Sequence, residues 1–353
     1  MIDEPTNHLD VETKKNLANY LKSKKGFIIV SHDRSFLDQV VDHILCIQHT
    51  HIEIQKGNFS SWQENNDKQI HFELTQNEKL QKDIQRLEIA SKNTSNWSDQ
   101  VEKTKYGTRN SGSKVDKGYI GHQSAKMMKR SKVIEKRVEK AIEQKTSLLK
   151  NVDKSDLLTI KPLNNSRNLL IAANDLQIKY NHQAIFDKIS FELKDGERLA
   201  ITGKNGAGKS SILKLILGEQ IDYDGYFKIV NDLKLSYVSQ MTHSLSGTLR
   251  DFAKLEHVNE GIFKAMLVKM GFSQLDLEKC IEELSEGQKK KVLLSKSISE
   301  SANIYIWDEP LNYIDILTRM QIEEAILKYK PTLIFIEHDE TFIKKIATKV
   351  LPL

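Results

Sequence analysis

The chain has 353 residues, of which 39% are hydrophobic and 29% are charged, so it is long enough for two domains with buried cores and is not a disordered polymer. It contains no run of about 18 apolar residues, which argues against a membrane domain. The two cysteines, Cys46 and Cys280, lie far apart and outside any metal-ligand spacing, which favours a reduced, cytoplasmic location.

The net charge of +5 is unevenly distributed along the sequence. Residues 101–150 contain 14 Lys or Arg and 5 Asp or Glu, a net charge of +9, so the rest of the chain carries −4. A partner rich in phosphate groups would suit this basic segment. A solvated helical surface is the alternative interpretation.

The first motif in the chain is MIDEPTNHLD, residues 1–10, and it returns near the C-terminus as IWDEPLNYID, residues 306–315. Each copy continues through a polar helical stretch into an apolar run that ends in His-Asp. Those runs are GFIIVSHDRSF at 26–36 and TLIFIEHDETF at 332–342.

The spacing inside the two copies also agrees. Glu4 precedes His32 by 28 residues, and Glu309 precedes His338 by 29. Two matched motifs at matched spacing indicate an internal duplication. The first copy begins in the middle of an expected strand, so it corresponds to the last part of the second copy only.

Two amphipathic helices are expected between the copies, at residues 65–89 and 131–152. Each has apolar residues at steps of three or four and is apolar on one side only, so the pair would cover each other as an antiparallel hairpin. Residues 93–130 between them are rich in Gly, Ser, Lys and Arg and are expected to form a basic tip. The two helical stripes comprise Ile70, Leu74, Asn77, Leu80, Ile84 and Leu87, and Ile134, Val138, Ile142 and Leu149.

A later strand, residues 199–201, leads into GKNGAGKS at 203–210, and an apolar helical pattern follows. Gly-x-x-x-x-Gly-Lys-Ser in this setting predicts a phosphate-binding loop, because glycines let backbone N–H groups face a phosphate at a helix N-terminus. Lys209 would bridge the β- and γ-phosphates, and Ser210 would bind Mg²⁺. A glycine-rich turn before a helix is the alternative. The expected loop residues are Gly203, Asn205, Gly206, Gly208, Lys209, Ser210 and Ser211.

The second Asp-Glu pair is expected to complete the chemistry at this loop. Asp308 ends the apolar run 304–307, a strand expected beside the phosphate loop, and would hold Mg²⁺ through water. Glu309 would orient or deprotonate the attacking water, and His338 would contact the γ-phosphate. A lone histidine at a strand end is more often structural, but the duplication and the Asp-Glu pair favour a catalytic role. By the same pattern, Glu4 and His32 are the catalytic candidates of the first copy.

Taken in order, the phosphate loop, LSEGQ at 284–288, Asp-Glu-Pro and His-Asp resemble the ATP-binding cassette superfamily over about residues 168–353. The resemblance implies an α/β P-loop NTPase fold with ATP and Mg²⁺ as cofactors. It also implies that the signature loop LSEGQ caps the γ-phosphate of a nucleotide held by a different cassette, through Ser285, Gly287 and Gln288.

Two further residues match positions of that family. Gln240, 31 residues after Lys209, lies where the family has a metal-contacting glutamine, so the implied metal set is Ser210, Gln240 and Asp308. Tyr180, 23 residues before Gly203, lies where the family has an aromatic residue that stacks on adenine. A core tyrosine is the alternative for Tyr180.

Two cassettes in one chain with a charged connector resemble the ABC-F group of ribosome-associated ATPases, of which DEPTNHLD is typical. The resemblance implies that the connector reaches the peptidyl-transfer region of the ribosome and contacts rRNA and the P-site tRNA. Lys and Arg side chains suit RNA phosphates, and a flexible linker without a partner is the alternative. The candidate RNA-binding residues are Lys105, Arg109, Lys114, Lys117, Lys126, Lys129 and Arg130.

The resemblance also implies a division of the chain. Residues 1–62 would be the C-terminal remnant of a first cassette, 63–165 a helical-hairpin linker with a basic tip, and 166–353 a second, complete cassette. The first cassette lacks a phosphate loop and a signature loop, so Glu4 and His32 would be orphaned. We therefore expect a C-terminal portion of a longer protein, impaired in ATP hydrolysis unless a missing N-terminal half or a homodimer supplies the partner loop.

The long tip, DEPLNYID and IEHDETF are similar to Lsa-type resistance proteins, which implies protection of the ribosome from lincosamides, streptogramin A and pleuromutilins. An ABC-F translation factor that acts on the P-site tRNA is the first alternative. An inactive nucleotide-binding remnant is the second. The ATPase subunit of a membrane transporter is a third, disfavoured by the fused repeat and the basic helical arm.

Overall fold

The computed structural model describes residues 1–6, 9, 11–47, 52–103, 158–165, 167–181, 183–243 and 245–353, and within the connector residues 122, 126, 129, 132, 133, 136–138, 140 and 141. The chain divides into two compact units, one formed by Met1–Ser60 with Ser155–Leu353 and the other by Ser61–Lys154. In the described part of the chain, no helix combines the length and the apolar character needed to cross a membrane.

A five-stranded parallel sheet forms the centre of the C-terminal part. The strands lie in the order β10–β11–β12–β8–β13, and every neighbouring pair is parallel. Both faces of such a sheet are covered, so its strands are nearly continuous apolar runs, such as the fully buried LIFI of β12. The strands are β8 (Arg198–Thr202), β10 (Leu235–Val238), β11 (Ile304–Asp308), β12 (Leu333–Ile336) and β13 (Lys349–Pro352).

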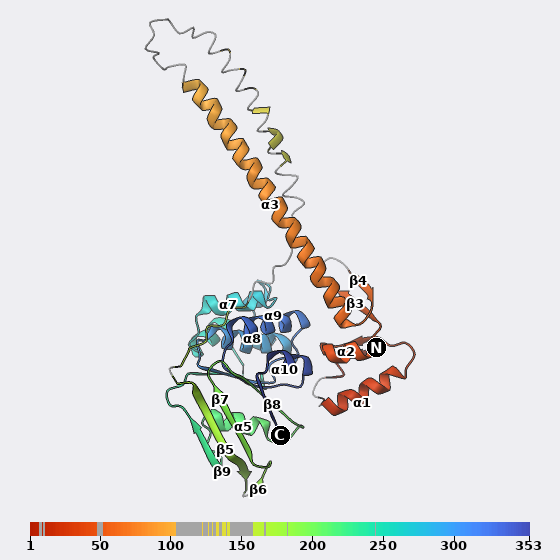
Figure 1. Cartoon of the computed structure of the whole chain (residues 1–353), viewed down its shortest axis with the longest axis vertical. Helices are drawn as coiled ribbons and strands as arrows, with labels where there is room; N and C mark the ends of the chain where they lie inside the picture. Colours follow the sequence, from red (N-terminus) through yellow and green to blue (C-terminus); the bar gives the residue numbers. More distant parts are fainter. Residues whose placement is uncertain are drawn as a thin grey trace. The chain divides into compact units, whose positions relative to one another are not determined.

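Side chains of this sheet alternate between two cores, one on each face, as the two-residue period of a strand requires. Ile306 and Ile334 belong to a core shared with α5 (Lys209–Ile216), whereas Trp307 and Phe335 belong to a core shared with the remaining helices. Figure 1 shows α7 to α10 on the side of the sheet opposite α5, β5 and β9. The helices of the second core are α6 (Leu249–Leu255), α7 (Glu260–Lys269), α8 (Glu286–Ser299), α9 (Ile316–Tyr329) and α10 (Glu340–Ile346), with 3-10 turns at Asp276–Glu278 and Ile281–Glu283.

An antiparallel sheet packs against the α5 side of the parallel sheet. Its long strand β5 (Leu169–Tyr180) pairs with β6 (Gln183–Ala184), β7 (Ile189–Lys194) and β9 (Tyr223–Ile229). This architecture confirms the predicted α/β cassette fold. Within the parallel sheet, β12 lies between β11, which ends at Asp308, and β8, which leads into the phosphate loop.

The N-terminal segment contains a two-stranded parallel sheet and two helices. β1 (Ile2–Asp3) pairs with β2 (Ile29–Val30), and a small core of Ala18, Leu21 and Phe36 joins them to the helices. An antiparallel hairpin follows. The elements are α1 (Val11–Lys22), α2 (Arg34–Val40), β3 (His43–Ile47) and β4 (Ile52–Lys56).

The two copies of the repeated motif adopt the same local structure. Glu4 has φ of 43° and Glu309 has φ of 47°, both in the left-handed region that few non-glycine residues occupy. Asp33 caps α2 by accepting from the backbone N–H of Phe36, and Asp339 caps α10 through Phe342 in the same way. The duplication inferred from the sequence is therefore present in the backbone.

The connector begins with one long helix, α3 (Phe59–Lys103), of 45 residues. It extends through residues 93–103, which the sequence analysis placed in the basic tip. No Gly or Pro interrupts residues 59–103, and the Asn, Thr and Ser residues there each lower helix propensity by only a fraction of a kcal/mol. Asn77, Leu80, Ile84 and Leu87 of the predicted stripe are half-buried. Of the second stripe, only Val138 is described, as a half-buried helical residue, and Ile134, Ile142 and Leu149 lie outside the described residues.

Candidate functional site

The predicted phosphate loop connects β8 to α5. Gly208 precedes the first turn of α5 with φ of 90°, and an added Cβ there would lie 2.7 Å from Cδ1 of Ile185, so only glycine fits. At Gly206, φ is 81° and an added Cβ would meet no atom within 4 Å. The loop thus presents open backbone at the N-terminus of an eight-residue helix, where N–H groups and the helix dipole favour an anion.

Lys209 is buried at the start of α5. Its Nζ donates to the carbonyl oxygens of Gly203 and Lys204, each at 2.9 Å. The ammonium group of Lys209 therefore lies over the loop that is predicted to bind phosphate. A cation in that position would offset negative charge bound by the loop.

Asp308 at the end of β11 meets Ser210 at the start of α5. The Ser210 hydroxyl donates to the Asp308 carboxylate, and burial together with the charge of Glu309 raises the pKa of Asp308. The second oxygen of Asp308, Oδ1, is buried without a hydrogen-bond partner among the described residues. A hydroxyl and a carboxylate with a spare buried oxygen suit Mg²⁺, a hard cation that prefers oxygen ligands. These residues fit the implied metal.

Glu309 is held from three sides. Nε2 of Gln240 donates to its Oε2 at 2.8 Å, Nδ2 of Asn312 donates to the same oxygen at 2.7 Å, and Nε2 of His338 lies 3.6 Å from Oε1. Burial alone would raise the pKa of Glu309, but His338 and the two amides hold it below its usual value. The carboxylate therefore stays ionised at neutral pH, as a group that orients or deprotonates water requires.

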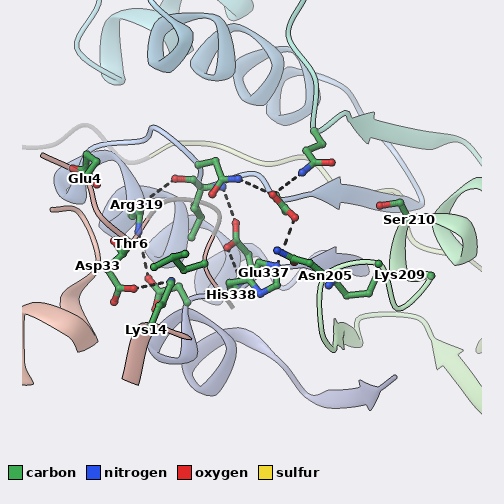
Figure 2. Close-up of a pocket in the computed structure, with 18 of the residues that line it drawn as sticks. Glu4, Thr6, Lys14, Asp33, Asn205, Lys209, Ser210, Arg319, Glu337 and His338 are labelled. Carbon is green, nitrogen blue, oxygen red and sulfur yellow. Dashed lines mark hydrogen bonds and ion pairs between the residues drawn. The ribbon is translucent and has the colours of Figure 1, made fainter. Parts of the chain in front are cut away.

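A cavity of about 400 Å³ joins the phosphate loop to the first copy of the repeat. Figure 2 shows Asn205, Lys209 and Ser210 on one side, Glu4, Thr6 and Lys14 on the other, and Glu337 and His338 between them. Ten predicted site residues line this cavity: Glu4, Asn205, Gly206, Gly208, Lys209, Ser210, Ser211, Gln240, Glu309 and His338.

In the first copy, Glu4 and His32 face each other as Glu309 and His338 do. Nε2 of His32 lies 3.5 Å from Oε1 of Glu4, and the backbone N–H of His32 donates to Oε2 at 3.4 Å. Burial raises the pKa of Glu4, and the hydrogen bond from His32 and the charge of Arg319 offset this only in part. Burial lowers the pKa of His32.

Tyr180 lies at the end of β5, and its hydroxyl donates to Oγ of Ser211 at 3.3 Å. The side chain is 46% exposed, so it is not a core tyrosine. An exposed ring tethered to the phosphate loop leaves a face available for stacking.

The predicted signature residues lie at the start of α8. Ser285 and Gln288 form a reciprocal capping box, in which Ser285 Oγ accepts from Gln288 N and Gln288 Oε1 accepts from Ser285 N. Gly287 packs so closely on the next loop that an added Cβ would lie 2.6 Å from the carbonyl oxygen of Tyr313. In the described structure, Ser285, Gly287 and Gln288 do not line the cavity at 203–210.

Lys290, one turn further along α8, links the signature helix to the nucleotide site. Its buried Nζ donates to the carbonyl oxygens of Ser239 at 2.8 Å, Gln240 at 3.4 Å and Asp308 at 3.2 Å. Burial lowers the pKa of Lys290 to about 8. Lys290 was not predicted from the sequence, because the motif LSEGQ ends at Gln288.

Of the candidate RNA-binding residues, Lys126 and Lys129 are exposed helical positions. Lys105, Arg109, Lys114, Lys117 and Arg130 lie outside the described residues.

Other residues that line the cavity were missed. Asn312 follows Glu309 by three positions within DEPLN, so its place in the repeated motif was the available signal. The others reach the cavity from separate segments, and all of them except Lys14 and Arg319 also lie within the repeated motifs. They are Thr6, Leu9, Lys14, Asp33, Leu311, Arg319, Glu337 and Asp339.

Comparison with known proteins agrees with this geometry. Residues 186–312 match the model of the ABC transporter family. Over 99% of its length, the chain also resembles archaeal ribosome recycling factor aABCE1, as seen in a crystal structure of the complex with ribosomal stalk protein aP1. The TM-score is 0.59, the sequence identity is 20%, and 56% of the aABCE1 chain is covered. This similarity supports the fold alone. The chain therefore contains a domain with the ATP-binding cassette fold.

Three curated relatives align with the chain over nearly its whole length. It is 30% identical to the putative ATP-binding protein YdiF and 27% identical to the ribosome protection protein VmlR, both of Bacillus subtilis (strain 168), over 100% and 99% of its length. It is 28% identical, over 99%, to the energy-dependent translational throttle protein EttA of Escherichia coli (strain K12). These relatives are ABC-F proteins, and the chain resembles them over nearly its whole length. It spans 51%, 64% and 59% of their respective lengths.

Proposed function

We propose that the chain binds Mg-ATP through residues 203–210 and that Glu309 directs hydrolysis there. The observation that carries this proposal is the convergence of Lys209, Ser210 and Glu309 at one cavity, with Asp308 bonded to Ser210. Bound phosphates would accept hydrogen bonds from the loop and from Lys209, whose ammonium would exchange carbonyl for phosphate oxygens. Mg²⁺, held by Ser210, Asp308 and Gln240, would neutralise charge on the β- and γ-phosphates.

In the same proposal, Glu309 accepts a proton from the attacking water or fixes its orientation. Gln240 and Asn312 hold Glu309 Oε2, which leaves Oε1 and the His338 imidazole facing the cavity. Tyr180 stacks on adenine beside Ser211. The signature residues Ser285, Gly287 and Gln288 act on a nucleotide held by another cassette, supplied by a further polypeptide segment or a second copy of the chain.

The binding step is tested with the 353-residue chain by titration with a fluorescent ATP analogue in the presence of Mg²⁺. Lys209→Ala should weaken binding by about 100-fold or more, because loss of one charge-assisted phosphate contact costs about 3 kcal/mol. Lys214→Ala is the matched control, since Lys214 is an exposed lysine on the same helix. Equal affinity of wild type and Lys209→Ala would refute the assignment of the loop.

We further propose that the chain acts on the ribosome as an ABC-F protein, and that this action is protection from lincosamide, streptogramin A and pleuromutilin antibiotics. Similarity to a ribosome protection protein and the residues DEPLNYID and IEHDETF support this choice. A translation factor acting on the P-site tRNA is the rival, supported by the similarity to a translational throttle protein. The connector, with its net charge of +9 at 101–150, would bind rRNA.

Removal of residues 104–118 separates these proposals. For ribosomal protection, cells that express the chain should grow under a lincosamide, and the deletion should abolish that growth while ribosome binding in sedimentation assays persists. The rival predicts no drug phenotype in either case and a change in translation rate instead. Growth under the drug that is unaffected by the deletion would remove the connector from the mechanism.

A further inference from the structure

The two copies of the repeat use different side chains to connect the loop after the glutamate to the strand before the histidine. In the first copy, Oγ1 of Thr6 and Oγ of Ser31 share a hydrogen bond of 3.1 Å, which ties the loop after Glu4 to the strand that ends in His32. In the second copy, the equivalents of Thr6 and Ser31 are Leu311 and Glu337. A hydroxyl pair is thus replaced by an apolar side chain and a carboxylate.

In the second copy, the carboxylate of Glu337 makes the equivalent connection by accepting hydrogen bonds from two backbone N–H groups. Its Oε1 accepts the N–H of Leu311 at 2.8 Å, and its Oε2 accepts the N–H of His338 at 3.1 Å. Glu337 is buried, and burial raises its pKa despite the nearby charge of Arg319. A buried group of this kind is costly unless both oxygens are bonded, which is the case here.

The loop that Glu337 holds contacts both Glu309 and the signature loop. Residues 310–315 connect β11 to α9, and within them Asn312 donates to Glu309 at 2.7 Å. The carbonyl of Tyr313 lies against Gly287 of the signature loop. Arg319 secures the other end of the loop by donating to the carbonyls of Leu311 and Ile314, each at 2.9 Å.

Arg319 also extends the chain of contacts to the first copy. Its Nη1 donates to the carbonyl oxygen of His32 at 3.0 Å. A continuous polar path therefore runs from His338 through Glu337, the Leu311 peptide and Arg319 to His32, and Figure 2 shows Glu337, His338 and Arg319 together in this region.

We propose that Glu337 is a positioning residue of the nucleotide site: by binding the N–H groups of Leu311 and His338, it fixes loop 310–315 against the histidine strand, so that Asn312 keeps Glu309 directed into the cavity. This inference rests on the proposed role of Glu309. Glu337 itself touches neither Mg²⁺ nor the attacking water.

The test uses the full chain and the pair found in the first copy. Glu337→Ser should speed amide hydrogen exchange in residues 309–314 about tenfold or more and lower ATP turnover about tenfold, while Mg-ATP affinity stays within twofold, because the phosphate loop is untouched. The double variant Leu311→Thr with Glu337→Ser recreates the Thr6–Ser31 pair and should restore both exchange protection and turnover. Glu337→Gln, which keeps one acceptor, should give an intermediate result, and Glu324→Gln on exposed α9 surface is the control.

Unchanged exchange in Glu337→Ser, or equal exchange in the single and double variants, would overturn the proposal. If the single variant does not fold, Glu337→Gln decides, and protection equal to wild type in that variant would likewise overturn it. A wild-type chain that binds ATP without turnover would indicate that the partner signature loop is missing, and the exchange measurements would then decide the role of Glu337 by themselves.

Discussion

In the first copy of the repeat, Ile28 and Val30 of the strand that leads to His32 are 68% and 39% exposed, whereas their counterparts Ile334 and Ile336 are 0% and 1% exposed. This difference in exposure follows from the neighbouring strands. β12 lies between β11 and β8 and is covered by a hydrophobic core on each face, whereas β2 pairs with β1 in a sheet of two strands. The backbone is nevertheless the same, down to the left-handed glutamate. The backbone conformation of the motif is therefore determined by local sequence features, such as the Asp cap and the Glu-Pro turn, and not by how deeply the motif is buried.

The chemical character of the two copies differs more than the backbone. Burial raises the pKa of Glu4, while His338, Gln240 and Asn312 hold the pKa of Glu309 down against the effect of burial. The pKa values of the two glutamates therefore shift in opposite directions, because their surroundings differ although their backbone conformation does not.

The largest effect is expected at the ion cluster between the first copy and α9. The guanidinium of Arg34 is bonded to both oxygens of Glu323 and lies 3.8 Å from Asp339, and all three side chains are buried. Arg34→Met should lower the free energy of unfolding by about 3–5 kcal/mol, because it leaves a buried carboxylate with Lys345 as its remaining bonded cation. Urea denaturation measures this loss.

The control is the equivalent position in the second copy. Glu340 is a partly exposed residue with surface ion pairs, so Glu340→Gln should change the unfolding free energy by less than about 1 kcal/mol. A loss below about 1 kcal/mol in Arg34→Met would show that the first copy does not depend on this contact.

The second prediction compares an isoleucine in the buried strand β12 with its exposed counterpart in the first copy. Ile334→Ala should cost about 2–5 kcal/mol of unfolding free energy, since it opens a cavity in a packed core. Ile28→Ala, the same substitution in the first copy, should cost less than about 0.5 kcal/mol because the side chain is already exposed. Thermal unfolding of both variants makes the comparison, and similar shifts would mean that Ile28 is covered in solution.

The glutamates give the third prediction. Glu309→Gln keeps the shape of the side chain and removes its basicity, so ATP turnover should fall by about 100-fold, equivalent to about 2.7 kcal/mol. Glu4→Gln should lower turnover by less than about tenfold, because Glu4 lies across the cavity from Lys209 and Ser210 (Figure 2). Phosphate release assays at equal ATP saturation test this, and the reverse order would exchange the roles of the two copies.

The smallest effect concerns Lys290, which has no counterpart in the first copy. Its folded-state pKa of about 8 lies below that of a free lysine, so between pH 8 and about 10.5 the unfolded chain binds more protons than the folded chain. Unfolding free energy should therefore rise with pH in this window, by up to about 1 kcal/mol per pH unit. Lys290→Met should lack this rise, and parallel pH curves for the two proteins would contradict the burial of a charged Lys290.

The sequence identified those parts of the site whose residue types are fixed by chemistry. A phosphate loop needs glycines and a lysine in sequence, and the Asp-Glu pair and the histidine recur at fixed spacing, so Lys209, Glu309 and His338 could be singled out and lie at one cavity. The α/β fold followed from the same motifs, because strands that precede them must be parallel and buried.

The parts that were missed depend on contacts between distant segments. Glu337 meets Leu311 across 26 positions, and Arg34 meets Glu323 across 289, and no periodicity records such pairs. The extent of α3 was underestimated because polar residues at 93–103 resemble a loop in composition, although nothing in them breaks a helix. The RNA-binding role stays a prediction for all seven candidates, Lys105, Arg109, Lys114, Lys117, Lys126, Lys129 and Arg130.

The unbroken length of α3 has a mechanical consequence. At a rise of 1.5 Å per residue, its 45 residues extend about 67 Å. Its first turn is clamped, because the backbone N–H and hydroxyl of Ser60 both donate to Asp38 and Phe59 is buried. A rod of that length converts a one-degree rotation at the clamp into a displacement of about 1.2 Å at the far end. Movements too small to disturb the hydrogen bonds of α2 would therefore become displacements comparable to an atomic radius at Lys103.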